Sequence, residues 1–429
     1  MSAKREEAVS KSQINWDFWK FFSGQTISNF GTSITAFALP LLVFKLTGSP
    51  INLAVTSAAT FLPYLLFGLV IGAWTDRTDR RRLMIACDLV RAVALGSIPV
   101  AYFAGVLSVY WIYTVAFVES TVSIAFNAGQ FAAIPSLVEG DDLVTANGRI
   151  NASFEAAQIS GPFLAGLALL TVPLATLFTV DAASFIVSAV SLGLIRTSFN
   201  APLQERSTHI LRDVVEGLRY VLGHPVLRMI SAMMAIWNFF NTTTFTQVVL
   251  FAKLQWRASD AQIGWLFSAG SVAAILFSLS VGRFRRRLRF SQMILGILAV
   301  TGLLMMAFSQ TRTYWVGVVV WSLWVGIGSM FDINTMSLRQ AIVPKEMLGR
   351  VMTIAGVLAW SAIPLGALAG GFAIQATHNV ALVYFVIGVV TLVIPIVFSF
   401  TPLGRAEDYL PSKGSSSAEA REGSGSANR

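Results

Sequence analysis

The sequence predicts an all-α membrane protein in which twelve transmembrane helices form two pseudo-symmetric six-helix bundles, with both termini cytoplasmic. Three observations support this fold class: the scarcity of charged residues, a series of long apolar stretches, and the placement of the basic residues. Of 429 residues, 55% are hydrophobic and only 12% are charged, whereas a soluble domain carries about 25% charged residues. The composition therefore argues against a soluble multidomain enzyme and against a disordered or fibrous chain.

Twelve apolar stretches follow one another along the chain, each long enough to cross a hydrocarbon core of ~30 Å. The first group lies at about 19–44, 51–73, 83–104, 109–134, 147–171 and 174–196. The second group lies at about 226–251, 260–282, 291–309, 313–337, 351–376 and 380–401. The first stretch is too long for a signal-peptide core and lacks a convincing cleavage site, so we expect a retained helix.

The positions of lysine and arginine test this topology independently. If both ends are cytoplasmic, the outside holds only Lys45, Lys253, Arg257 and Arg312, and Arg91 lies within the third stretch. The other 26 of the 31 basic residues then fall in cytoplasmic loops and tails or at the cytoplasmic ends of the stretches, in agreement with the positive-inside rule. The net charge of +9 therefore reflects topology and contact with anionic lipid, and no nucleic-acid partner is expected.

The apolar stretches divide the chain into five parts. We expect a cytoplasmic N-terminal segment (1–16), an N-terminal six-helix bundle (17–196), a cytoplasmic linker (197–225), a C-terminal six-helix bundle (226–402) and a disordered cytoplasmic tail (403–429). Helical periodicity within the linker predicts an amphipathic helix there. The tail is rich in Ser, Gly, Ala and Glu and cannot bury a core.

Two segments of the chain resemble each other. Gly148-Arg149-Ile150 is followed by Pro162, 13 residues after the arginine, and Gly349-Arg350-Val351 is followed by Pro364, 14 residues after the arginine. An arginine-rich loop also follows the second apolar stretch of each half. A parallel six-plus-six repeat is typical of a large transporter class that binds its substrate between the halves.

Polar side chains recur at helical spacing on the first and fourth helix of each half. Because polar groups are costly in lipid, these stripes predict a shared polar cavity; hydrogen bonding between packed helices is the alternative interpretation. The cavity candidates are Gln25, Asn29, Ser123, Asn127, Asn238, Asn241, Trp321, Trp324 and Asp332. Aromatic residues flank the stripes, which favours a bulky amphiphile over a sugar or a small ion as substrate.

Five acids lie within the predicted spans: Asp88, Glu119, Glu155, Asp181 and Asp332. Glu119 has no basic partner on its own helix and lies near the midplane, and Glu155 lies one to two turns into the fifth helix. Both are candidates for carrying a coupled proton, with a permanently protonated carboxyl as the alternative. Asp88 and Arg91 are three residues apart and predict a structural ion pair. Asp181 lies on a helix without a polar stripe, and we assign it to helix packing.

The segment Gly72-Ala73-Trp74-Thr75-Asp76-Arg77-Thr78-Asp79-Arg80-Arg81 resembles the signature loop of the major facilitator superfamily. The pattern of that loop is Gly-x-x-x-Asp-Arg-x-Gly-Arg-Arg/Lys, between the second and third helices. The resemblance implies a conformational gate in which Gly72, Asp76, Arg77, Arg80 and Arg81 hold the cytoplasmic side closed. Asp79 departs from the pattern, which usually has Gly at this position.

Other segments resemble one branch of this superfamily, the macrolide-efflux and enterobactin-exporter proteins (transmembrane secretion effectors). They include Phe22–Ser28, Ala38–Val43 and Asp181–Phe185, and the resemblance covers about residues 16–400. It implies a single-chain exporter driven by the proton gradient. The chain departs from the family at Glu119, in a region where many members have an Arg. It departs again in the antiporter pattern of the fifth helix, which has Ala at two of the glycines. Gly161, Pro162 and Gly166 are retained in that pattern and are assigned to close helix packing.

Together these features predict a secondary active transporter rather than an enzyme. We expect it to export a bulky amphiphilic small molecule, drug-like or siderophore-like, across the inner membrane by proton antiport and alternating access. No cofactor is expected beyond the proton gradient, and the lone Cys87 with three scattered histidines predicts no metal site. The expected partners are the substrate and membrane lipids, with the chain working as a monomer. A lipid or lysolipid flippase on the same fold is the alternative, and a non-transporting receptor or enzyme is a further one.

Overall fold

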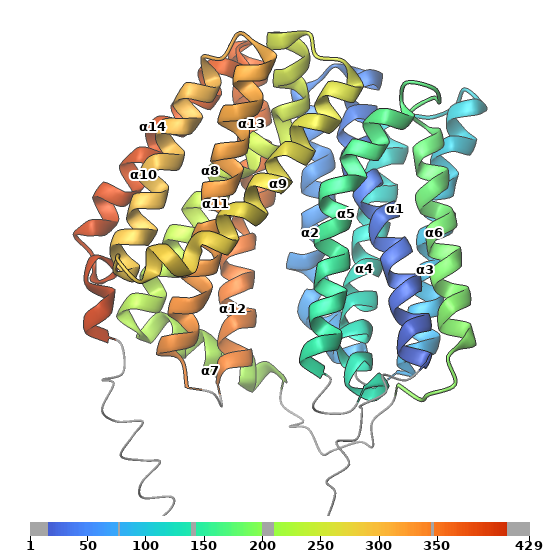
Figure 1. The fold of residues 1–429 in the computed structure, drawn as a ribbon, viewed down its shortest axis with the longest axis horizontal. Coiled ribbons are helices and arrows are strands. Elements are labelled where there is room, and N and C mark those ends of the chain that lie inside the picture. Colours follow the sequence, from blue (N-terminus) through green and yellow to red (C-terminus); the bar gives the residue numbers. More distant parts are fainter. Residues whose placement is uncertain (1–15, 76–77, 139–142, 200–209, 345–346, 410–429) are drawn as a thin grey trace, which may run out of the picture. The chain divides into compact units, whose positions relative to one another are not determined.

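The computed structural model describes residues 16–75, 78–138, 143–199, 210–344 and 347–409, and every regular element in these ranges is a helix (Figure 1). This confirms the all-α prediction. The elements are α1 (Trp16–Thr47), α2 (Pro50–Thr75), α3 (Arg80–Phe103), α4 (Val109–Leu137), α5 (Leu143–Ala168), α6 (Thr176–Leu194), α7 (Ile210–Gly223), α8 (Pro225–Trp256), α9 (Asp260–Arg285), α10 (Phe290–Ser309), α11 (Tyr314–Ile342), α12 (Leu348–Trp360), α13 (Ala362–Thr377), α14 (Val380–Ser399) and the 3₁₀ segment η2 (Pro402–Tyr409).

Ten helices in the described ranges are long and apolar enough to cross a membrane. A bent pair, Val215–Gly223 with Pro225–Trp256, makes eleven if it is one span. The helix α5 is not among these ten helices. It is long enough, at 26 residues, but the polar side chains of Asn147, Arg149 and Glu155 lower its mean hydropathy. The count of twelve spans and the cytoplasmic placement of both termini stay predictions.

The helices form two compact units. Unit 1 comprises Met1–Leu42 and Leu66–Arg206, and unit 2 comprises Val43–Leu65 and Ser207–Arg429. The segment 43–65 is therefore grouped with helices that begin more than 140 residues later in the chain. Within unit 2 the Gln247 side chain donates a hydrogen bond to the Pro50 carbonyl at 2.7 Å, which ties this segment to α8.

Both α1 and α2 pass from one unit to the other close to a proline. Pro40 lies inside α1, two residues before the change at Leu42, and Pro63 lies inside α2, two residues before the change at Leu65. A proline in a helix interior removes one main-chain hydrogen bond and weakens the helix locally. The sequence thus places a weak point in each helix that belongs to two units.

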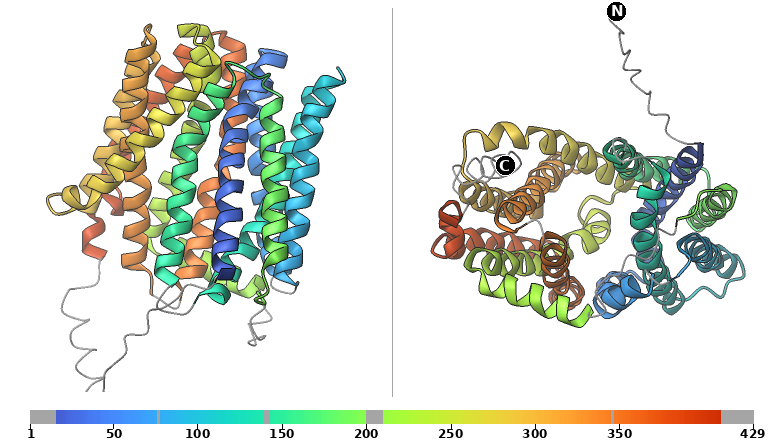
Figure 2. Two further views of the ribbon diagram at one scale, coloured as in Figure 1. Left: turned by 45° about the vertical axis from the view of Figure 1, so that its right-hand side comes forward. Right: turned by 90° about the horizontal axis from the view of Figure 1, so that it is seen from below.

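In unit 1, α3 packs along both α6 and α4, and Figure 2 shows α3 and α6 side by side. The helix α1 approaches α6 closely at two glycines. A Cβ on Gly24 would lie 2.8 Å from Cβ of Ser191, and a Cβ on Gly31 would lie 2.5 Å from Oδ1 of Asp181. The absence of a side chain at both positions allows this close packing.

In unit 2, α10 packs along α14, α9 along α11, and α8 along α13. Figure 1 shows α10 and α14 running side by side. At their crossing, a Cβ on Gly302 would lie 2.8 Å from the Leu392 main-chain nitrogen. The predicted single stretch at 351–376 is two helices, α12 and α13, separated at Ser361. The helix α7 covers the whole of the predicted amphipathic segment, 211–221, and its Val221 is buried in a cluster with Val343 and Val351.

Candidate functional site

In unit 1 an ion pair joins the buried Arg91 of α3 to the half-buried Glu119 of α4. The Arg91 guanidinium donates to Oε1 of Glu119 from Nη2 at 2.8 Å and from Nε at 3.2 Å. Ser123, one turn along α4, donates to the same oxygen at 2.9 Å. The guanidinium also stacks on the Phe185 ring of α6, 3.8 Å from its centroid, so Arg91 connects three helices.

This arrangement changes the predicted role of Arg91. The sequence pairs it with Asp88, and the structure does place Nη1 of Arg91 3.9 Å from Oδ1 of Asp88. The hydrogen-bonded partner, however, is Glu119. Glu119 thus has a basic partner on another helix. The spacing of residues within α4 could not predict this partner.

Two further acids lie in the same region without a comparable partner. Asp88 on α3 is fully buried, and Asp181 on α6 is 1% exposed. The hydroxyl of Ser188 interacts with Asp88, and that of Thr35 interacts with Asp181. By ordinary geometry, however, neither oxygen of Asp88 makes a hydrogen bond with the described residues, and Oδ2 of Asp181 makes none either. Arg91 acts electrostatically on both acids, so a single cation faces three carboxyl groups.

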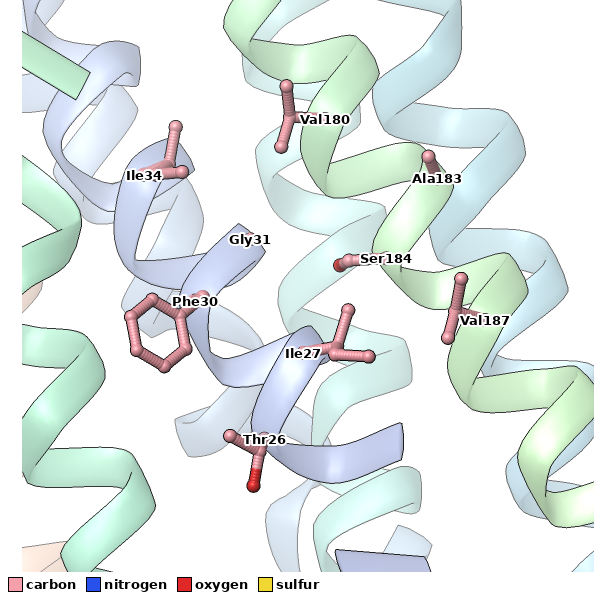
Figure 3. A pocket seen from close by; sticks show the side chains of 9 residues that line it. All are labelled: Thr26, Ile27, Phe30, Gly31, Ile34, Val180, Ala183, Ser184 and Val187. Atoms are coloured by element: carbon pink, nitrogen blue, oxygen red, sulfur yellow. The ribbon is translucent and has the colours of Figure 1, made fainter. Parts of the chain in front are cut away.

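A groove of about 390 Å³ lies against Asp181, between α1 and α6 (Figure 3). Its walls are mainly apolar, and its hydroxyls come from Thr26 and Ser184. The Ser184 hydroxyl also lies 3.1 Å from Oδ1 of Asp181. The groove was not predicted from the sequence because it depends on how two helices far apart in the chain pack together.

The predicted polar stripe on α1 is used largely for contacts between helices. Gln25 is buried and donates to Ser188 of α6 at 3.1 Å. Asn29 donates to Ser153 of α5 at 3.3 Å. Around Gly161, α5 passes close to Ser33 of α1, and Pro162 and Gly166 are buried beside it. These contacts agree with the alternative interpretation of the stripe, in which its polar side chains bond to neighbouring helices.

Two other candidates of the first half lie differently. Asn127 is exposed on α4, and Glu155 is exposed on α5. Glu155 forms none of the ion pairs that hold the Arg91 cluster together. Within unit 1 the structure therefore groups Glu119 with Ser123 and Arg91 and leaves Glu155 apart.

In unit 2 the predicted stripe residues fall into buried and exposed groups. Trp321 and Trp324 are only 1% and 3% exposed and pack on each other with ring centroids 5.2 Å apart. Asn238 donates to the Ala359 carbonyl at 2.9 Å, and Asn241 is half-buried. Asp332 is exposed on α11, and its main electrostatic partner is Arg339.

The predicted gate is only partly described. Asp76 and Arg77 lie outside the described residues, and Gly72 lies in α2. Arg80 donates to the Phe199 carbonyl at 3.0 Å, and Arg81 donates to the carbonyls of Leu192 and Gly193. The Arg81 contacts hold the start of α3 to the carboxyl end of α6, where a cation is favoured, and the Arg80 contact holds it to the segment that follows α6.

Asp79, the departure from the superfamily pattern, is the N-cap of α3. Its side chain accepts a hydrogen bond from the Arg82 main-chain nitrogen at 2.9 Å. A glycine at this position could not make that contact, so the departure has a local structural reason.

A second charged cluster lies in unit 2. Asp260, at the first position of α9, pairs with Lys45 of α1 and with Lys253 of α8, the latter at 2.5 Å. In the sequence these two lysines serve only as markers of topology. Their pairing was missed because the three residues are adjacent only in the folded chain.

Comparison with known proteins identifies the family. The family model for transmembrane secretion effectors, a branch of the major facilitator superfamily, matches residues 15–420. The chain belongs to this family. Its members are transporters rather than enzymes.

The relatives of this transmembrane secretion effector are efflux pumps. The multidrug efflux pump Tap of Mycolicibacterium fortuitum is 29% identical over 355 residues, 80% of this chain and 85% of that protein. Macrolide efflux protein A of Streptococcus pyogenes is 24% identical over 365 residues, 82% of this chain and 88% of that protein. The solved nucleoside transporter NupG shares the fold, with a TM-score of 0.72 and 14% identity, over 89% of this chain and 98% of that one. The chain is therefore a multi-pass membrane efflux transporter in general terms.

Proposed function

We propose that this chain exports a bulky, amphiphilic, drug-like or siderophore-like compound across the inner membrane by proton antiport and alternating access. The printed names of its relatives, a multidrug pump and a macrolide pump, support the cargo class. Both termini would lie in the cytoplasm, as the placement of basic residues favours. The chain would work as a monomer with the proton gradient as its energy source.

The observation that carries the proton-antiport proposal is the charged cluster of unit 1. Arg91, Glu119, Asp88 and Asp181 come from three helices that are long and apolar enough to cross a membrane. Ionisable groups inside a membrane are costly and typically mark ion or proton pathways. A cluster that holds more carboxyls than cations can take up and release a proton.

The exposed polar residues of each unit are the better cargo contacts. Asn127 in unit 1 and Asp332 in unit 2 are exposed, whereas Trp321 and Trp324 are buried in packing. We therefore assign the amphiphile to the exposed polar residues and the aromatic side chains that remain accessible, such as Phe245.

The proposal is tested with the full chain in proteoliposomes that carry an imposed pH gradient and radiolabelled erythromycin, a macrolide. The wild type should accumulate erythromycin only when the gradient is present. Glu119→Gln should lose this accumulation because Arg91 then lacks its anionic partner. Asp408→Asn, the matched acid-to-amide change at an exposed residue of η2, should behave as the wild type. Export by Glu119→Gln at the wild-type rate would exclude Glu119 from coupling.

The gate is tested by kinetics. Asp76→Asn should slow turnover while erythromycin still binds, because the loop would no longer hold the cytoplasmic side closed. Unchanged turnover would remove Asp76 from the gate.

A lipid or lysolipid flippase is the second candidate function, and the apolar groove between α1 and α6 is the observation that favours it. A groove with walls of this kind suits an acyl chain. Fluorescent phospholipid added to the same proteoliposomes separates the two functions. Gradient-dependent lipid translocation without erythromycin transport would replace the efflux proposal.

A further inference from the structure

The ion pair between Arg91 and Glu119 leaves two buried acids of unit 1 unexplained. With all groups ionised, Asp88, Glu119 and Asp181 would carry three negative charges against the one positive charge of Arg91. An unpaired carboxylate buried away from water costs several kcal/mol and is usually avoided by taking up a proton. The cluster is electrically neutral when two of its three acids are protonated.

Among the described residues, Arg91 is the one cation that acts electrostatically on Asp88 and Asp181. In α1 there is no charged residue between Lys20 and Lys45, and Asp181 is the one charged residue of α6. The groups around Asp181 are Arg91 and Asp88 of α3, Glu119 of α4, and the hydroxyls of Thr35 and Ser184. The proton balance of the cluster is therefore set by its own three acids and Arg91.

The two carboxyl oxygens of Asp181 differ in their hydrogen bonds. The Ser184 hydroxyl has one hydrogen and two oxygens within reach, the Asp181 main-chain carbonyl at 2.8 Å and Oδ1 of Asp181 at 3.1 Å. The hydroxyl donates to Oδ1, whereas the buried Oδ2 of Asp181 makes no hydrogen bond of ordinary geometry with the described residues, so Oδ2 is the oxygen that can hold a proton.

Asp181 also differs from Asp88 in its surroundings. Ser184 and Gly31, which both lie against Asp181, are part of the groove wall (Figure 3). Asp88 is fully buried and makes no hydrogen bond of ordinary geometry to the described residues. Asp181 is itself only 1% exposed, but it thus lies next to two residues of the groove wall.

We propose that Asp181 is the residue that carries the coupled proton and that Arg91 is the cation that responds to its ionisation. This inference rests on the proposed proton antiport. When the O–H bond of Asp181 breaks, the proton passes to water that leads to the cytoplasm, and the carboxylate competes with Glu119 for Arg91. Uptake of a proton from the outside returns Arg91 to Glu119. Arg91 belongs to α3 and contacts Glu119 of α4 and Phe185 of α6. Each proton cycle therefore changes the contacts among three helices.

The test separates coupling from transport in proteoliposomes with erythromycin as the probe. Asp181→Asn should lose all accumulation driven by the pH gradient but should still exchange labelled for unlabelled erythromycin when no gradient is present. Exchange shows that the variant is folded and moves its cargo. Asp181→Glu keeps a carboxyl, so it should keep gradient-driven accumulation with an altered pH profile, and it replaces Asp181→Asn if the latter does not fold.

Proton release upon binding gives a second readout. Detergent-purified wild type in weak buffer should release protons when erythromycin binds, and Asp181→Asn should not. Gradient-driven accumulation by Asp181→Asn would overturn the proposal, and its loss in Asp88→Asn alone would transfer the role to Asp88. If erythromycin accumulation by the wild type does not depend on the pH gradient, proton antiport itself is wrong. If the wild type and Asp181→Asn both depend on the gradient, only the assignment of the proton to Asp181 is wrong.

Discussion

Arg91 on α3 donates two hydrogen bonds to a single carboxylate oxygen of Glu119 on α4, at 2.8 and 3.2 Å. The two side chains are 28 residues apart in the sequence, and the guanidinium is only 7% exposed. A buried cation of this kind is stable only while its partner remains. This pair therefore holds α3 and α4 together. In the proposed mechanism, Glu119 is also the partner of Arg91 while Asp181 is protonated.

The first prediction concerns the energy of this pair. Arg91→Gln should lower the free energy of unfolding by about 3–5 kcal/mol, because it leaves a partly buried carboxylate without its cation. The double variant Arg91→Gln/Glu119→Gln should be less destabilised than the sum of the single variants, with a coupling energy of ~1–3 kcal/mol. Unfolding by SDS titration in mixed micelles measures all three. Additive effects would show that the two side chains do not interact.

The second prediction separates packing from cargo binding in unit 2. Trp321 packs on Phe245, Phe308 and Trp324 with centroid distances of 5.2–5.6 Å. Trp321→Ala should therefore cost about 3–5 kcal/mol of stability. Asp332→Asn, at an exposed residue, should keep stability and change erythromycin transport.

SDS unfolding and erythromycin transport are measured for both variants. A stable Trp321→Ala protein with altered cargo preference would place Trp321 in the binding surface instead, as the sequence stripe first suggested.

The third prediction tests the close approach of α13 to α8. A Cβ on Gly366 would overlap the main-chain carbonyl of Phe239, and a carbonyl cannot move aside as a side chain can. Gly366→Ala should cost about 1–3 kcal/mol through overpacking. Gly356→Ala is the matched control, since nothing lies within 4 Å of a Cβ there, and it should be neutral or slightly stabilising. Equal effects of the two changes would mean that α8 and α13 do not pack as described.

The fourth prediction concerns the departure from the superfamily pattern. Asp79→Ala should destabilise α3 by ~1 kcal/mol because the N-cap contact with the Arg82 nitrogen is lost. Asp79→Gly restores the family residue and should cost only a few tenths of a kcal/mol. Thermal unfolding in detergent compares the two variants. A greater loss in Asp79→Gly than in Asp79→Ala would contradict the capping role.

The sequence allowed prediction of the features that depend on spacing within one helix. Apolar length and the signature loop indicated the helical membrane fold and the family, because both are local patterns. The polar stripes were also visible, but periodicity cannot distinguish a cavity wall from a packed face. For Gln25 and Trp321 the distinction depends on which helix lies opposite, and the structure buries both.

Pairings between helices could not be predicted. The partner of Arg91 was expected at Asp88, one turn away, whereas the hydrogen-bonded partner lies on the next helix. The surroundings of Asp181 likewise come from α1, α3 and α4. A helix without a polar stripe can still carry a functional acid when its neighbours provide the polar groups.

The most direct test of the account is simultaneous measurement of proton and drug movement. Wild-type protein is reconstituted into liposomes that contain a pH-sensitive dye, and labelled erythromycin is added under an imposed pH gradient. The account predicts that erythromycin moves one way while protons move the other, and that both fluxes disappear in Asp181→Asn although erythromycin exchange persists. Erythromycin accumulation with no accompanying proton flux would contradict it.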